Sequence, residues 1–212
     1  MNACHDLIPG TDLPRVNFSP VGFDHADMLH AWLSDDRVCC WLDFGGGRQQ
    51  LTKLALYALL TSKRNLARLF HPAGDATPIG LVCMTDIDNP MGSSEVWGMR
   101  GLYGTAPKHI ATSAMLTALA TGFVDQGREV MGSWLVDGNA PSMQIHRKLG
   151  LTETGRQRAR HRMHGRLHDR VLFDITREEF IQRFPDVPSE TGRTCRSMGW
   201  LGTADQMLAA AA

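Results

Sequence analysis

Residues 130–151, VMGSWLVDGNAPSMQIHRKLGL, decide the fold class of this chain. Val130 to Val136 has the length and apolar character of a strand, and Asp137-Gly138 is a turn signal. Ala140 to Leu149 then reads as a short helix that ends at Gly150. A strand that turns directly into a helix indicates a mixed α/β domain.

The elements on either side of this stretch extend the mixed pattern. Ile110 to Val124 carries an apolar side at helical spacing, with Gly127 as a stop signal. Ile79 to Met84 is almost wholly apolar, as in a strand covered on both faces. The remaining expected elements are strands at Arg15–Val21, Ala67–Phe70 and Glu95–Tyr103, helices at Asp24–Leu33, Leu51–Leu60 and Glu178–Phe184, and a hairpin of Thr152–Met163 with Leu167–Ile175. We expect a leader at 1–14, a domain at 15–184 and an extension at 185–212.

Composition sets the limits within which these elements must work. The chain has 212 residues, 43% of them hydrophobic, and its 22 basic and 22 acidic residues cancel. That balance argues against generic coating of nucleic acid or membranes. No apolar run approaches the roughly 20 residues of a membrane-spanning helix, and the first residues lack the pattern of a signal peptide. The five cysteines have no disulfide-framework spacing, so we expect reduced thiols and a cytoplasmic location.

The middle of the chain carries a recognisable set of motifs. They are the helix start Ile110-Ala-Thr-Ser-Ala-Met115, the pair Val136-Asp137, Asn139, Ser142, and the segment His146-Arg-Lys-Leu-Gly-Leu151. Together they resemble the GNAT (Gcn5-related) N-acetyltransferase superfamily, nearest to its ribosomal-protein-acetylating and small-amine-acetylating branches, over about residues 15–176. The resemblance implies an α/β fold: a twisted mixed sheet of about seven strands, splayed between the fourth and fifth strands and flanked by helices. It also implies an amine that attacks an acyl thioester directly.

The resemblance assigns a set of donor-binding residues. Acetyl-CoA or another acyl thioester would lie in the splay, with its pyrophosphate at the helix N-terminus, where free N–H groups and the helix dipole favour anions. The implied residues are Met99, Gly101 and Leu102 for the pantetheine arm, Lys108, His109, Ile110, Ala111 and Thr112 for the pyrophosphate, and Asn139 and Ser142 beside the thioester. A plain turn role is the alternative for Asn139.

The phosphate loop departs from the family pattern. The family has Gln/Arg-x-x-Gly-x-Gly/Ala before the helix, whereas this chain has Ala106-Pro107-Lys108-His109-Ile110-Ala111. Pro107 has no N–H to donate, and His109 carries a Cβ where glycine allows the backbone to approach phosphate. Lys108 and a protonated His109 can supply charge instead. An acyl carrier protein or an aminoacyl-tRNA is therefore the alternative donor.

Two residues are the catalytic candidates that the resemblance implies. Glu95 begins the fourth strand, where the family often places a base for the amine proton; Asp86 and Asp88 are alternatives, as is an exposed strand-end carboxylate without a role. His146 occupies the position of the family tyrosine that protonates the leaving thiolate, and histidine can donate a proton near neutral pH. A partly exposed helix residue is the alternative for His146. We expect Trp41 and Trp97 to line the acceptor pocket.

Two further side-chain groups lie on the expected hairpin. Arg156, Arg158, Arg160 and Arg162 alternate, so on a regular strand they share one face. That face is either solvated or a cationic surface for an acidic carrier protein or tRNA. His161, His164 and His168 have loosely ligand-like spacing, but 161 and 164 point to opposite faces and no cysteine cluster completes a site, so we expect no metal.

These observations and the resemblance predict an N-acyltransferase that moves an acyl group, acetyl in the family's usual chemistry, from a thioester to a primary amine on a small molecule or peptide. The first alternative keeps this chemistry with a carrier-protein or tRNA donor docked on the Arg156–Arg162 face. The second is a catalytically silent binding module. No membrane partner is expected, and a homodimer is compatible with the sequence.

Overall fold

The computed structural model describes residues 7–102 and 106–200. Within them, seven strands form one sheet in the order β1-β2-β3-β4-β5-β7-β6. β4 and β5 are parallel, and the other neighbours are antiparallel. The strands are β1 (Val16–Pro20), β2 (Leu66–Pro72), β3 (Gly80–Thr85), β4 (Ser93–Arg100), β5 (Val130–Val136), β6 (Thr152–Met163) and β7 (Arg166–Thr176). This confirms the expected mixed fold.

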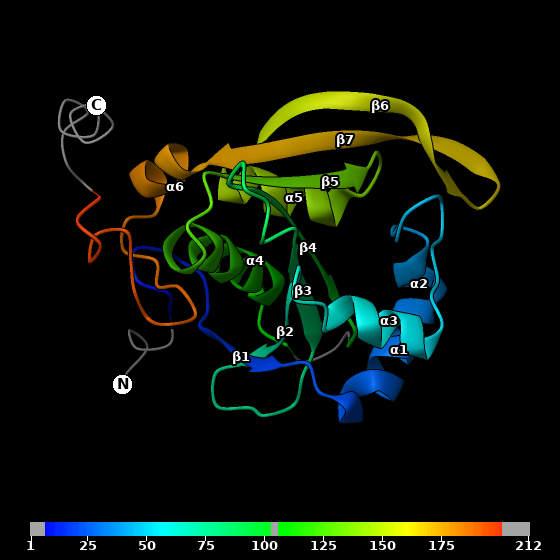
Figure 1. Cartoon of the computed structure of the whole chain (residues 1–212), viewed down its shortest axis with the longest axis horizontal. Helices are drawn as coiled ribbons and strands as arrows, with labels where there is room; N and C mark the ends of the chain where they lie inside the picture. Colours follow the sequence, from blue (N-terminus) through cyan, green and yellow to red (C-terminus); the bar gives the residue numbers. More distant parts are fainter. Residues whose placement is uncertain (1–6, 103–105, 201–212) are drawn as a thin grey trace.

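Helices cover both faces of the sheet (Figure 1). The helices are α1 (Ala26–Ser34), α2 (Asp36–Cys39), α3 (Lys53–Leu60), α4 (Ile110–Ala120), α5 (Ala140–Leu149) and α6 (Arg177–Arg183). Side chains of α1, α2 and α3 pack against β2 and β3 in one cluster, while α4, α5 and α6 pack with β4, β5 and β7 in another. None of the helices in these described residues is long and apolar enough to cross a membrane.

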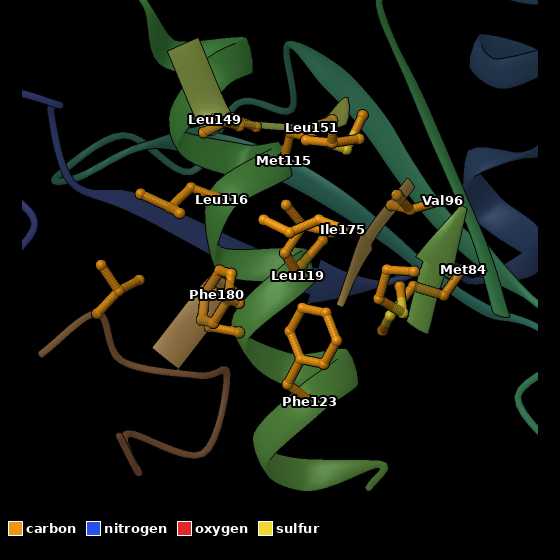
Figure 2. Close-up of a cluster of buried hydrophobic side chains, with 14 of the residues drawn as sticks. Met84, Val96, Met115, Leu116, Leu119, Phe123, Leu149, Leu151, Ile175 and Phe180 are labelled. Atoms are coloured by element: carbon orange, nitrogen blue, oxygen red, sulfur yellow. The ribbon is translucent and has the colours of Figure 1, made fainter. Parts of the chain in front are cut away.

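The larger cluster fixes α4 against the sheet (Figure 2). Leu116, Leu119 and Phe123 are fully buried, and the Phe123 ring packs on Phe180 of α6 at 5.0 Å between centroids. Burying one such side chain contributes about 1.5–3 kcal/mol. Because α4 is apolar on nearly every side, it forms a rigid central element, and its first turn is held at a fixed place beside β4.

Most expected elements lie within two residues of their predicted bounds, and three differ. The helix expected at Ile110–Val124 is α-helical to Ala120 and continues as a π-helical turn, Thr121–Asp125. The short helix α2 was not expected, because four residues are too few to show a period; the Asp35 side chain caps it by accepting from Arg37 N. Cys39 and Cys40 thus lie at the end of a helix rather than in a loop, and both are buried. β4 ends at Arg100, and Tyr103 of the prediction lies outside the described residues.

A bulge interrupts β6 within the run of four hairpin arginines, while Arg156 and Arg162 pair with Val171 and Leu167, two positions of β7 that lie on one face. β6 pairs with β7 from Thr152–Asp174 to Gln157–Arg170, with one register shift between Glu153 and Gly155. Pairing resumes at His161–His168, so three residues of β6 face one of β7. Ala159 in this bulge has φ 51° and its N–H donates to the Asp169 carboxylate at 2.9 Å. Arg158 and Arg160 flank Ala159, so the alternation that the sequence suggested is broken there.

The segments on either side of the expected domain pack against it where they are described. Ile8 and Leu13 are buried in the same cluster as α4, in contrast to the expected loose leader. Val187 and Cys195 are fully buried in that cluster, and Glu190 pairs with Arg68 of β2 at 2.6 Å. Residues 7–14 and 185–200 therefore contribute to the core.

Candidate active site

An opening in the sheet between β4 and β5 creates the candidate site. In this fully described region the two strands pair at three positions, Ser93–Val130, Ser94–Met131 and Glu95–Gly132. Beyond Glu95 and Gly132 both strands continue without pairing to each other, so alternate backbone N–H and C=O groups on their inner edges face the gap. This confirms the divergence expected between the fourth and fifth strands.

The opening holds a cleft with two adjacent halves that share several wall residues. We call one the aromatic half, of about 280 Å³, because Trp41, Phe44, Trp97 and Trp134 line it. We call the other the helix half, of about 310 Å³, because Ala111 and Ala114 of α4 line it. The walls common to both halves are Trp41, Leu42, Gly98, Met115, Asn139 and Ser142. Trp41 and Trp97 thus lie in one cavity, as the sequence predicts.

Glu95 is the carboxylate that β4 places in the aromatic half. Ser94 and Val96 are buried toward α4, so alternation directs Glu95 and Trp97 to the opposite face. The Glu95 carboxylate accepts no hydrogen bond from the described residues. Although its side chain stays open to solvent, the surrounding walls withdraw water and raise its pKa; the nearby Asp86 charge adds to the rise and Arg170 opposes it.

The alternative bases Asp86 and Asp88 are engaged elsewhere. The Arg64 guanidinium bonds to Asp86 at 2.5 Å and to Asp88 at 3.3 Å. Neither carboxylate lines either half of the cleft as described. Of the three acidic candidates that the sequence offered, Glu95 alone is therefore placed to meet a ligand there.

His146 reaches the cleft beside a serine that the sequence did not single out. Its ring is 3% exposed; Nδ1 lies 2.8 Å from the Ser142 carbonyl oxygen and Nε2 lies 2.9 Å from Ser133 Oγ. A carbonyl can only accept, so Nδ1 carries the proton. Burial lowers the pKa of His146, and the Ser142 carbonyl partly offsets this. In the neutral ring, Nε2 therefore accepts the Ser133 hydroxyl proton.

An ion pair buried behind the aromatic half supports its walls. Asp43 pairs with Arg170, and their side chains are 9% and 13% exposed. The Arg170 guanidinium also stacks on Trp134, with Cζ 4.1 Å from the ring centroid. Burial alone would raise the pKa of Asp43, but Arg170 and the amides of Gly45 and Gly47 hold it below the usual carboxyl value.

The hairpin braces the loop that carries Trp41 and Asp43. His161 Nε2 lies 2.6 Å from the Cys40 carbonyl oxygen, and Gln49 Nε2 donates to the Arg162 carbonyl at 2.8 Å. His168 pairs opposite His161, whereas His164 lies in the turn, 3.9 Å from Asp36. Among the described residues, no three His, Cys, Asp or Glu side chains form a group that could hold a metal ion.

The helix half contains part of the expected donor-binding set. Met99 and Ala111 line it, while Ile110 and Thr112 are buried and do not line it. His109 has φ 64° and precedes the first turn of α4, which has no side-chain cap. Lys108 and His109 are both exposed beside this turn.

The backbone amides of two residues expected to bind the acyl donor are already hydrogen-bonded within the protein. The Gly101 and Leu102 amides both donate to the Ile79 carbonyl, at 2.9 and 3.2 Å. Gly101 also lies against the Trp32 ring, where an added Cβ would meet a ring carbon at 1.9 Å. The backbone of β4 that faces the cleft is therefore Gly98 to Arg100 rather than residues 101 and 102.

Asn139 and Ser142 form the N-terminal cap of α5 and also line the cleft. The Asn139 side chain caps α5 by accepting from Ser142 N at 3.2 Å. Both residues line both halves of the cleft. The turn role and the site position that the sequence left open are thus held by the same side chain, because the cap of α5 lies at the mouth of the gap.

The arginines of β6 lie outside the cleft. Arg156 pairs with Asp137 and Glu153, both at 3.0 Å. All four arginines of the expected face are exposed, and none lines either half. The basic residues that do line the helix half are Arg37 and Arg100, which no sequence pattern marked.

The comparisons with known proteins agree with this architecture. Solved structures with the same fold include Mycobacterium smegmatis RimJ in complex with CoA-disulfide, at TM-score 0.64 and 19% identity over 77% of this chain and 83% of that one. They also include spermidine N-acetyltransferase from Vibrio cholerae in complex with CoA and spermine, at TM-score 0.65 and 15% identity over 78% and 98%. A GNAT-family acetyltransferase from Bacillus anthracis matches at TM-score 0.63 and 16% identity over 79% and 98%.

The likeness is one of fold. No protein-family model matches the sequence, and a sequence search finds no match among curated proteins. These three structures share less than a fifth of their residues with this chain, so the likeness shows the fold alone. That fold is the GNAT fold, as the sequence resemblance implied.

Proposed function

We propose that this protein is an N-acyltransferase that moves an acyl group, acetyl in the first instance, from acyl-CoA to a primary amine by direct attack. The observation that carries the proposal is the two-sided cleft at the β4–β5 gap. Glu95 lines the aromatic half, and Ser133 with His146 borders it from the α5 side. Structures with this fold include CoA complexes of acetyltransferases, which supports CoA as the donor.

The donor is proposed to enter through the helix half. Its pantetheine arm would pair with the β4 backbone at Gly98 to Arg100, where the missing β5 partner leaves groups free to bond. Its phosphates would meet the uncapped first turn of α4, where the helix dipole favours negative charge. Lys108 and His109 would add positive charge there in place of the family's glycine-rich loop.

The chemistry then divides between the two sides of the cleft. The amine nitrogen attacks the thioester carbon, a C–N bond forms and the C–S bond breaks. Glu95 takes the amine proton, since its raised pKa makes it a stronger base than an ordinary carboxylate. A protonated His146 would pass a proton from Nε2 through the Ser133 hydroxyl to the departing sulfur, so that Ser133 acts as the relay.

The test is titration with acetyl-CoA followed by an assay of thiol release with a panel of amines. We expect binding, and thiol release only when an amine is present. Ala111→Phe should block the helix half and abolish donor binding, whereas Leu54→Phe, at an exposed position outside the cleft, should not. Absence of binding at millimolar acetyl-CoA contradicts the proposal.

The two alternatives predict other results. A carrier-protein donor predicts that Arg158→Glu with Arg160→Glu cripples turnover, whereas CoA-dependent turnover should survive this charge reversal, because both side chains lie outside the cleft. A silent binding module predicts that acetyl-CoA binds and that no amine in the panel releases thiol.

A further inference from the structure

The side chains that line the aromatic half indicate the class of amine that fits there, which the fold alone does not indicate. Its walls bring together four aromatic side chains from three separate segments: Trp41 and Phe44 from the loop after α2, Trp97 from β4 and Trp134 from β5. Phe44 and Trp97 meet edge to face at 6.1 Å between centroids. Aromatic faces attract a cation and also cover apolar groups, so such a cavity fits an ammonium group carried on an apolar body.

The acidic groups around this cavity are mostly neutralised. Asp43 lines it, but its Oδ1 accepts from Gly45 N at 2.7 Å and Gly47 N at 3.0 Å, and its Oδ2 pairs with Arg170. Its charge is therefore balanced within the protein. A second ammonium group placed beside Asp43 would also lie near the Arg170 guanidinium and be repelled by it.

Glu95 is the remaining carboxylate on these walls. It accepts no hydrogen bond from the described residues, and the arginine nearest Asp86 and Asp88 is already shared between them. Among the described residues, Glu95 is thus the one carboxylate lining the cavity that has no hydrogen-bond or ion-pair partner. An additional ammonium group placed against these aromatic walls would lose part of its hydration without a second unpartnered carboxylate to replace it, which disfavours its binding.

We infer that the acceptor is a small primary monoamine on an apolar, aromatic or branched aliphatic body, and that polyamines are poor acceptors. This rests on the proposed function and adds the class of acceptor. The cavity volume of about 280 Å³ lies at the lower end of ligand pockets, which suits a body of about one ring. The expected preference is thus opposite to the spermine seen in the Vibrio cholerae complex.

The experiment compares kcat/KM at fixed pH and ionic strength for phenethylamine, isoamylamine, putrescine and spermidine, with acetyl-CoA as donor. We expect both monoamines to exceed both polyamines by at least about tenfold, a factor that modest pocket contacts can supply. Trp41→Ala should raise KM for phenethylamine and leave spermidine nearly unchanged. Phe23→Ala, which removes an exposed aromatic outside the cavity, should change neither.

Two outcomes overturn the inference while leaving the proposed function intact. One is a kcat/KM for spermidine equal to or above that of the monoamines. The other is a Trp41→Ala variant in which kcat/KM falls by the same factor for all four amines. If no amine is acetylated although acetyl-CoA binds, the proposed function fails instead. Calorimetric titration of the CoA-loaded protein then decides the inference from binding alone. Tighter binding of phenethylamine than of spermidine supports it, and the reverse order or equal binding overturns it.

Discussion

Glu95 lies directly opposite Gly132 at the last paired position of β4 and β5, so the one unbalanced carboxylate of the aromatic half lies at the point where the sheet opens. A base at this position meets an amine that approaches from the aromatic side while the thioester lies in the gap beyond. The pairing therefore fixes the position at which the proposed proton transfer to Glu95 would occur.

Glu95→Gln should lower kcat by about 10²–10⁴-fold, the usual contribution of a positioned general base. KM for acetyl-CoA should change little, because Glu95 lies in the aromatic half rather than in the helix half. Steady-state kinetics with phenethylamine measures both constants. Asp88→Asn is the matched control: it removes a carboxylate that pairs with Arg64 outside the cleft, and turnover should persist. Equal losses in the two variants would contradict the assignment.

The pH profile of kcat should carry the signs of two shifted groups. Glu95 works when deprotonated, and its pKa is raised, so the rate should rise with pH over a range above the ordinary carboxyl value of 4.5. His146 works as an acid when protonated, and its pKa is lowered. As the pH is raised, kcat should therefore begin to fall at a pH lower than the ordinary histidine value of 6.5. The pH range in which Glu95 is deprotonated and His146 is protonated is thus narrowed at both its acid and its alkaline end.

Rate measurements on single variants separate these two limbs. Glu95→Gln should remove the rise on the acid side and leave the fall, and His146→Gln should do the opposite. The same amine must be used throughout, because the fraction of neutral, nucleophilic amine at each pH differs between amines. A profile that His146→Gln leaves unchanged would remove His146 from the proton path.

Ser133 and His146 should behave as one unit. If His146 acts on the sulfur through the Ser133 hydroxyl, Ser133→Ala and His146→Gln should each lower kcat by about 10²-fold, and the double variant should be no worse than either. Independent roles would instead multiply the two losses. A double-mutant cycle at the pH optimum distinguishes the two cases. Circular dichroism of each variant checks that the protein still folds without the buried Ser133–His146 hydrogen bond.

The Asp43–Arg170 pair should contribute mainly to stability. Asp43→Asn leaves a guanidinium buried without its partner charge, a change that costs about 3–5 kcal/mol in the free energy of unfolding. In a chain of this size that lowers Tm by about 10 °C. Asp27→Asn is the control, because the Asp27–Lys53 pair is exposed and should contribute at most about 1 kcal/mol. Thermal unfolding followed by circular dichroism compares the two variants.

The sequence predicts this fold where the pattern is local and fails where a contact joins distant segments. β5, α5 and β6 have the bounds expected from their apolar spacing and turn signals. The β6 bulge was missed because alternation of arginines carries no information on register, which here depends on the Asp169 contact to Ala159. Asp43 and Arg170 lie 127 positions apart, so no spacing rule could pair them.

The candidate site shows the same division. The resemblance pointed to Glu95 and His146, and Trp41 and Trp97 were expected to line the acceptor pocket from their places in the chain; the structure brings all four to one cavity. Ser133 was not found, since a serine within an apolar strand looks like any other strand residue until α5 places His146 against it. The signal that could have found it is the alternation of β5, which directs Ser133 to the same face as Met131 and Leu135.

His109 offers a test of the altered phosphate loop. It holds φ 64° directly before α4, a left-handed conformation that costs a residue with a Cβ about 1 kcal/mol and glycine almost nothing. His109→Gly should therefore raise the free energy of unfolding by up to about 1 kcal/mol. It should also let the backbone approach phosphate more closely and so tighten acetyl-CoA binding, measured by calorimetry at pH 8.

The control for this variant is Lys108→Ala, which removes a charge without changing the backbone. We expect it to weaken acetyl-CoA binding, and to weaken it less at high salt, because screening reduces the contribution of an exposed lysine. If His109→Gly instead loosens acetyl-CoA at pH 8, the imidazole itself contacts the donor, and the loop binds phosphate through side chains rather than through the backbone. That outcome would contradict the placement of the pyrophosphate on the first turn of α4.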